Sequence, residues 1–225
     1  MALPLPLRNR LAELILDALR EPEAKAVLDK LDRHCRQAEP GTCEADPPAR
    51  FPMDFFDRRE GRLVLKETYL SFRDELCERV SRACAALRER PLSEESPSLS
   101  QILVEAAALF DARLHFEVHE LLEPYWLRAQ GDERQILQGL IQVAVGYHHL
   151  ANGNLPGARA LLEEGSAKLV DGDLGGFPLR GFALKVRQSL AAIDRLGIEG
   201  AGTFDWSLMP RFQRESTHGS HPSPQ

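Results

Sequence analysis

The sequence predicts an all-α protein, a compact multi-helix bundle or array with an N-terminal helical extension. Three observations indicate this class. Apolar residues recur at helical spacing along most of the 225 residues, as in the stripe Leu11, Leu14, Ile15 and Ala18. No segment shows a convincing alternation of apolar and polar residues, so we expect no β-strands. The hydrophobic fraction of 43% is sufficient for a buried core.

The first 98 residues form the predicted extension. Its first helix carries the stripe above, and its second begins near Pro22, which fits the first turn of a helix. Residues 37–52 are rich in Pro, Gly, Asp and Glu, and we expect them to be a loop. A long third helix is expected over residues 63–90. The serine-rich segment 91–100 ends it and offers helix caps.

Residues 99–200 form the predicted bundle core, and residues 201–225 form an aromatic anchor segment and a disordered tail. Helices are expected over about 99–111, 116–129, 133–151, 158–170 and 182–197, with a loop at 171–181. Pro124 should kink the second of these helices and leave the carbonyl of Glu120 unbonded. Gly131 is expected to stop the same helix.

Charge and hydropathy exclude two classes of partner. The chain has 28 basic and 34 acidic residues, a formal net charge of −6, so we expect no nucleic-acid partner. No apolar run approaches the ~20 residues of a membrane span. The N-terminus lacks the features of a secretory signal. We therefore expect a cytoplasmic protein with no membrane partner, whose N-terminal helices offer a surface for a homo-oligomer.

The four cysteines are Cys35, Cys43, Cys77 and Cys84, and none forms a C-x-x-C pair. Cys77 and Cys84 are seven residues apart on an expected helix, about 10 Å along its axis, which is too far for a disulfide. We expect free, reduced thiols. A zinc site that draws on all four cysteines is the alternative.

A polar stripe follows one face of the helix expected over 116–129. Successive residues of a helix turn by ~100°, which places His119, Glu120 and Glu123 within about a third of the circumference, with Glu117 at the edge. Alone, such a stripe is also what a solvated helix face looks like.

The next helix is apolar nearly all round except for a narrow stripe formed by Gln138, Gln142 and His149. Gly139 and Gly146 flank this stripe, and glycines allow another helix to approach or leave room for a ligand. The short turn between the two helices makes them antiparallel neighbours. Because buried polar groups need partners, we expect the two stripes to face each other.

Such a cluster supports two classes of function. In a metal-dependent hydrolase, His119, Glu123 and His149 would bind one divalent ion, namely Zn, Mn, Fe or Ni. Glu120 would be the base that activates water, and Gln142 would orient the substrate or a ligand. Metal-free proton transfer is a variant. In the alternative, a non-catalytic scaffold or partner-binding module, the His/Glu/Gln cluster is a structural polar network.

Three segments carry a family resemblance, "LFDARLHFEVHELLEPYW", "LQGLIQVAVGYHHLANGN" and "GARALLEEGSAKL". In order and spacing they resemble the bacterial and archaeal domain-of-unknown-function 309 family over about residues 109–169. The family motif E-x-H-E-x-x-E falls on Glu117, His119, Glu120 and Glu123, and the histidine of Y-H-x-x-x-G-N falls on His149. The resemblance implies a small all-helical bundle and, from the His/Glu motif, a metal-dependent hydrolase.

Four positions depart from the family pattern near the expected cluster, so its chemistry could differ here. Asp111 stands where Asn is usual, Arg113 where Gly is common, His115 where an aromatic is common, and His148 where Tyr is usual. We expect His115 to precede the helix and to lie outside the cluster. Glu117 and Gln138 are expected to flank the site.

Overall fold

The computed structural model describes residues 2–36, 51–59, 62–94, 96–170, 172–196 and 201–212. It confirms the all-α prediction. Within these residues the α-helices are α1 Leu5–Asp17, α2 Pro22–Arg36, α3 Arg73–Leu87, α4 Leu99–Asp111, α5 His115–Arg128, α6 Gly131–Ala151, α7 Leu155–Leu169 and α8 Arg180–Arg195. None of the described helices is both long and apolar enough to cross a bilayer.

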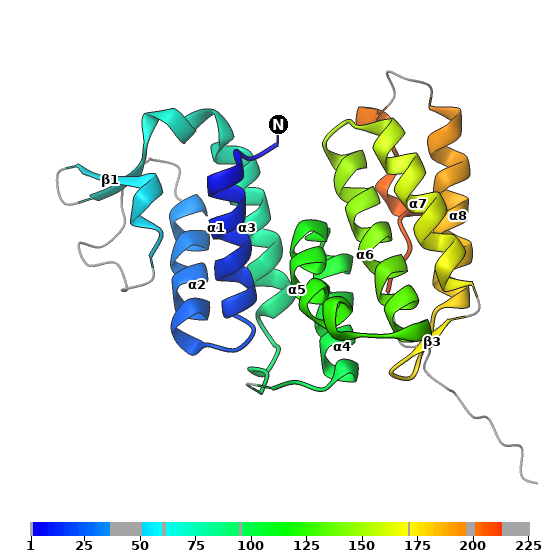
Figure 1. Cartoon of the computed structure of the whole chain (residues 1–225). Helices are drawn as coiled ribbons and strands as arrows, with labels where there is room; N and C mark the ends of the chain where they lie inside the picture. Colours follow the sequence, from blue (N-terminus) through cyan, green and yellow to red (C-terminus); the bar gives the residue numbers. More distant parts are fainter. Residues whose placement is uncertain are drawn as a thin grey trace, which may run out of the picture.

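The helices form two groups with α4 and α5 between them (Figure 1). The N-terminal group is α1–α3, and the C-terminal group is α6–α8. Helix α5 contacts α1 on one side and α6 on the other, and α6, α7 and α8 pack in sequence. One hydrophobic core runs through both groups, from Leu3 to Phe212. The division of the chain at residue 98 therefore stays a prediction.

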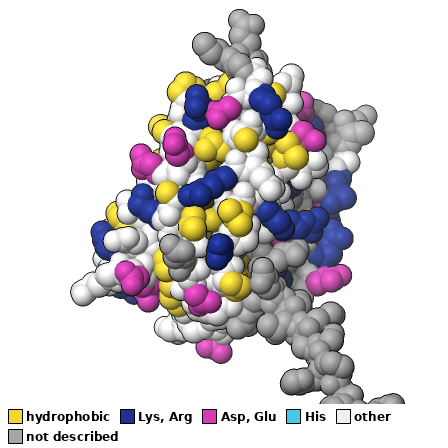
Figure 2. Space-filling view, turned by 90° about the vertical axis from the view of Figure 1, so that its right-hand side faces the viewer, with side chains coloured by type: hydrophobic (Ala, Val, Ile, Leu, Met, Phe, Trp, Pro, Cys, Tyr) yellow, Lys and Arg dark blue, Asp and Glu magenta, His cyan; other side chains and the backbone are white. Residues whose placement is uncertain are grey.

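The face on the α8 side of the molecule carries interspersed basic and acidic side chains with scattered hydrophobic ones, and shows no histidine (Figure 2). The histidines of α5 and α6 are therefore not displayed on this face.

Two short hairpins contradict the expectation of no strands. Strand β1 Phe56–Arg59 pairs antiparallel with β2 Arg62–Leu65, and β3 Asp173–Leu174 pairs with β4 Phe177–Pro178. The 3-10 helix η2 Glu67–Phe72 follows β2, so the expected helix over 63–90 begins only at α3. Leu63 and Leu65 are buried and Val64 is half-buried, which is the alternation of a β-strand. It extends over too few residues to be recognised as a strand in the sequence.

Helix ends follow local chemistry, with one correction. Ser98 caps α4 through a capping box with Gln101, which confirms the serine cap. Gly131, with φ 55°, is the first residue of α6 and does not stop α5. Helix α5 instead ends because Ala129 is extended. The expected loop at 37–52 falls largely, and the expected tail from about 213 entirely, outside the described residues.

A disulfide joins Cys35 of α2 to Cys77 of α3, with Cα atoms 5.3 Å apart. The expectation of free thiols is therefore wrong for this pair, because α2 and α3 pack side by side. Cys84 is free and buried, and Cys43 lies outside the described residues. Disulfides are more frequent in oxidising compartments, so the cytoplasmic location stays a prediction.

Helices α6 and α7 approach closely where both carry glycine. A Cβ atom on Gly165 would lie 2.8 Å from the backbone oxygen of Gly139. A Cβ atom on Gly146 would lie 2.8 Å from Cγ of Leu162. The face of α6 that carries Gly139 and Gly146 is therefore turned toward α7.

We expect Gly165→Ala to destabilise the protein by about 1–3 kcal/mol, because the added methyl group meets backbone that cannot rotate away. Urea denaturation measures this change. Gly202→Ala is the control, since no atom lies within 4 Å of its Cβ position. Equal stability of the two variants would contradict the close approach of α6 and α7.

Candidate functional site

Three side chains of α5 come together on its half-buried face: His119, Glu120 and Glu123. Nδ1 of His119 lies 3.0 Å from Oε1 of Glu120, and its Nε2 lies 4.0 Å from Oε1 of Glu123. One ligand atom from each residue can be chosen so that all three lie within 4.8 Å of one another. One turn of helix thus brings a nitrogen and two oxygens within 4.8 Å of one another, without help from another element.

The stripe of α6 does not join them. Gln142 donates to Oε2 of Glu164 at 2.7 Å and accepts from Nζ of Lys168 at 2.8 Å, and both partners belong to α7. The expected arrangement, in which the stripes of α5 and α6 face each other, is therefore not the one that forms. Gln142 lies between Gly139 and Gly146 on the face of α6 that is turned toward α7, so its side chain meets α7 and not α5.

His149 closes the turn between α6 and α7. Oδ1 of Asn154 accepts from the backbone N–H of Gly157 at 3.0 Å, so its Nδ2 donates to Nδ1 of His149, 2.7 Å away. The predicted metal ligand is thus engaged in capping α7. Gln138, one turn before Gln142, is half-buried on α6.

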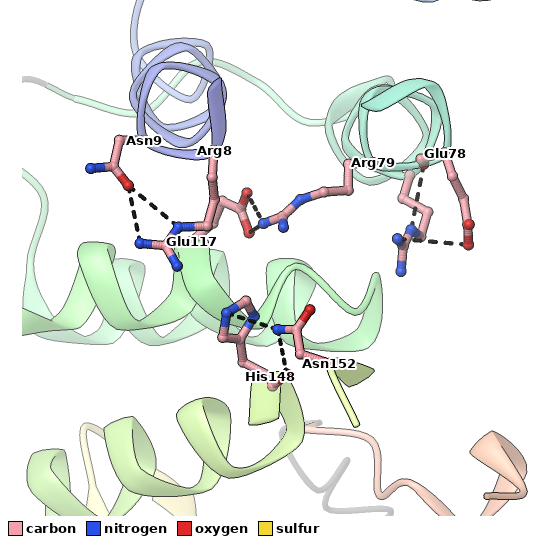
Figure 3. Close-up of polar contacts among 8 residues, drawn as sticks. Arg8, Asn9, Glu78, Arg79, Glu117, His148 and Asn152 are labelled. Atoms are coloured by element: carbon pink, nitrogen blue, oxygen red, sulfur yellow. Dashed lines mark hydrogen bonds and ion pairs between the residues drawn. The ribbon is translucent and has the colours of Figure 1, made fainter. Parts of the chain in front are cut away.

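Glu117 lies at the centre of the fold and not at the edge of a site. Nη2 of Arg79 donates to both of its carboxylate oxygens, at 2.7 and 2.9 Å (Figure 3). The exposed fractions are 8% for the Arg79 side chain and 0% for that of Glu117. The sequence signal was the position of Glu117 between the polar and apolar faces of its helix, since a buried carboxylate needs a cation. Its partner lies in another helix, 38 residues earlier.

His115 is the first residue of α5 and is buried, so the expectation that it precedes the helix is wrong. Its ring stacks against Tyr147 and Trp206, with centroid distances of 5.5 and 6.3 Å. It lies outside the group of His119. Burial holds the pKa of His115 well below its usual value, so the ring is neutral near neutral pH.

His148 is the second histidine of this region. Burial, and then the positive charge of Arg79 and Arg8, lowers its pKa to about 4. Asn152 donates from Nδ2 to Nε2 of His148 at 3.1 Å (Figure 3). Since Nδ2 also donates to the backbone oxygen of His148, at 2.8 Å, Nε2 is the acceptor and the proton of the neutral ring is on Nδ1.

A polar cavity of about 170 Å³ lies between α3, the turn before α5 and the end of α6. Its lining is mainly charged or aromatic: Glu75, Glu78, Arg79, Arg82, Arg113, His115, His148, Asn152 and Trp206. We call His119, Glu120 and Glu123 the α5 group. Phe116 lies between this group and the cavity, with its ring 5.8 Å from that of His148 and 6.2 Å from that of His119. The sequence does not predict this cavity, because its arginines come from α3 and from the turn before α5, which are far apart in the chain.

We expect Arg79→Met and Glu117→Met each to destabilise the protein by about 3–5 kcal/mol, since each leaves a buried charge without its partner. The double variant should lose much less than the sum. A double-mutant cycle by urea denaturation measures the coupling. Arg159→Met is the control, because its pair with Asp194 is exposed and should contribute about 0–1 kcal/mol. Additive losses would contradict a coupled buried pair.

We expect the free energy of unfolding to fall as the pH falls from 6.5, the ordinary value for histidine, to about 4, the folded pKa of His148. In this window the unfolded state takes up the proton first, so protonation favours unfolding. The contribution of His148 is at most about 3 kcal/mol. Urea denaturation at about pH 7 and about pH 4.5 measures it, and His148→Gln should show the smaller loss. An equal loss in both proteins would show that His148 is not responsible.

Comparison with known proteins finds a family match for the segment that contains His119, Glu120 and Glu123. Residues 103–161, from within α4 to within α7, match the family described as domain of unknown function DUF309. No curated protein and no solved structure is similar enough to match the chain. The matched segment contains the α5 group, His115 and His148, whereas Arg79 and Arg82 precede it. Over this segment, about a quarter of its length, the chain is similar to the DUF309 family.

Proposed function

We propose that the chain binds one divalent metal ion at His119, Glu120 and Glu123 and uses it in a hydrolytic reaction. The observation that carries the proposal is the convergence of three ligand atoms, one per residue, within 4.8 Å on a single helical turn. Imidazole nitrogen with carboxylate oxygen suits Zn, Mn, Fe or Ni.

The position of the group on the helix supports a catalytic role over a structural one. The side chains of His119, Glu120 and Glu123 are 27%, 38% and 43% exposed. Ligands from one turn occupy one side of an ion, so its other coordination positions would be open to solvent and substrate. Open positions distinguish catalytic metal sites from closed structural sites.

The residues have separable roles in this proposal. His119 and Glu123, at positions i and i+4, would hold the ion. A bound divalent ion supplies Lewis-acid chemistry and lowers the pKa of a coordinated water. Glu120 lies beside them and is partly exposed, so its carboxylate would accept a proton from water at the site or complete the ligand set.

The other motif residues support the fold and not the reaction. Gln142 and His149 have partners on the α7 side of α6, and Glu117 is neutralised by Arg79. The alternative of a structural polar network describes these residues well. It does not describe His119, Glu120 and Glu123, for which the described residues outside this helical turn provide no hydrogen bond or ion pair.

We expect protein stripped on a chelating resin to bind one equivalent of Zn²⁺ or Mn²⁺ in isothermal titration calorimetry. His119→Ala should weaken binding by at least about tenfold, a change of ~1.4 kcal/mol. His149→Ala is the matched control and should bind as the wild type does. Saturating metal, at about 100 times Kd, should also stabilise the wild type by ~2.7 kcal/mol against urea.

Three results decide the proposal. Absence of stoichiometric binding, or equal binding by His119→Ala and wild type, would overturn the metal site. If metal binds, hydrolysis of chromogenic carboxylic and phosphate esters is measured for loaded and stripped protein. Glu120→Gln should then reduce the metal-dependent rate, and a rate independent of metal for every ester would overturn the hydrolytic role.

A further inference from the structure

A second polar site lies outside the α5 group, and we name it the arginine pocket. It is the cavity lined by Arg79, Arg82, Arg113, His115, His148 and Trp206, among others. We propose that the arginine pocket binds a small oxyanion, a phosphate or a carboxylate group. Four features of the pocket support this proposal.

The first feature is the convergence of cations in an acidic protein. The chain has a net charge of −6, yet three guanidinium groups from two separate segments line one cavity. Arg79 and Arg82 lie one turn apart on α3, and Arg113 belongs to the turn before α5. Guanidinium groups bind carboxylate and phosphate oxygens through paired N–H donors.

Acidic groups also face the pocket. Glu75 and Glu78 line it with the three arginines, which gives 3 − 2 = +1 for the lining, and Glu117 compensates Arg79 from α5. Glu78 is 62% exposed, and its carboxylate lies 3.6 Å from Nη2 of Arg82. This ion pair is long and exposed to solvent and contributes little free energy, so an anion can replace Glu78 at Arg82.

The second feature is a buried donor without an acceptor. Arg79 uses Nη2 for both oxygens of Glu117, while its Nε is buried and has no hydrogen-bond partner among the described residues. The side chain is more than nine-tenths buried and lines the cavity. A buried donor without an acceptor is unfavourable, so Glu117 leaves the hydrogen-bonding capacity of the Arg79 guanidinium only partly used.

The third feature is the backbone of Arg113. Its φ of 57° makes it the one residue other than glycine with positive φ in the described part of the chain. This conformation is unfavourable for a side chain such as arginine. It places the guanidinium 5.5 Å from the centre of the Trp206 ring, at the pocket. The conformation closes the end of α4, where the N–H groups of Arg113 and Leu114 donate to the carbonyls of Phe110 and Leu109, and it also presents the cation to the cavity.

The fourth feature is the size and polarity of the remaining wall. The cavity volume of about 170 Å³ is below the ~300–1,000 Å³ of pockets for drug-sized ligands, so a single small anion fits better than a nucleotide. His148 is neutral with its proton on Nδ1, and so adds no charge. Trp206 provides an aromatic wall and also a spectroscopic probe.

The test uses tryptophan fluorescence in the full chain. Trp126→Phe leaves Trp206 as the single tryptophan. This protein, freed of metal on a chelating resin, is titrated with inorganic phosphate and separately with succinate, at ionic strength held constant with sodium chloride. We expect a saturable change of Trp206 fluorescence with at least one of them. Phosphate alone would assign the pocket to phosphate groups, and succinate alone to carboxylates.

Variants in the same background show whether the arginines are responsible. Arg82→Gln and Arg113→Gly should each raise Kd by about tenfold or more, as expected for loss of a charge-assisted hydrogen bond. Arg113→Gly removes a strained side chain, so its melting temperature should not fall while its affinity does. Arg187→Gln, on the exposed side of α8, removes the same charge elsewhere and should leave Kd unchanged.

Two outcomes would overturn the proposal. One is no saturable change with either anion. The other is an equal Kd in Arg82→Gln, Arg113→Gly and Arg187→Gln, which would reduce the effect to net charge. Because the protein is metal-free throughout, neither outcome depends on the metal site proposed for α5.

Discussion

The buried ion pair between Arg79 and Glu117 determines how the rest of the structure is arranged. Two full charges leave water together, which is tolerated only because the carboxylate is bound through both oxygens. The pair joins α3 to α5, and so connects the N-terminal helices to residues 103–161. It also fixes the rotation of α5. With Glu117 inward, His119 is turned by ~200° about the axis, toward the partly exposed side of the helix.

The close contact of α6 with α7 has a comparable effect on the second half of the motif. Glycine at both sides of this contact brings the backbones together and commits the polar stripe of α6 to α7. As a result, a motif that looks like one site is divided among three tasks. Glu117 pairs with Arg79 in the core, Gln142 and His149 join α6 to α7, and His119 with Glu120 and Glu123 forms the partly exposed group that we propose to bind a metal ion.

The two proposed sites differ in their dependence on the N-terminal helices. The α5 group is complete within one helical turn of the DUF309 segment. The arginine pocket requires α3, because Arg79 and Arg82 precede that segment. Phe116 lies between the two sites, in contact distance of the rings of His119 and His148. The proposed metal site and the proposed anion site are therefore neighbours, separated by the ring of Phe116.

The sequence by itself determined the features that depend on residues close together in the chain. The helical class, the Ser98 cap and the convergence of His119 with Glu123 all follow from spacing within a few residues. Only the tertiary structure decided the features that join distant residues. These are the Arg79 partner of Glu117, the Cys35–Cys77 bond, and the side of α6 on which Gln142 finds its partners. Helical periodicity fixes which side chains share a face, but the packing of neighbouring helices decides what that face meets.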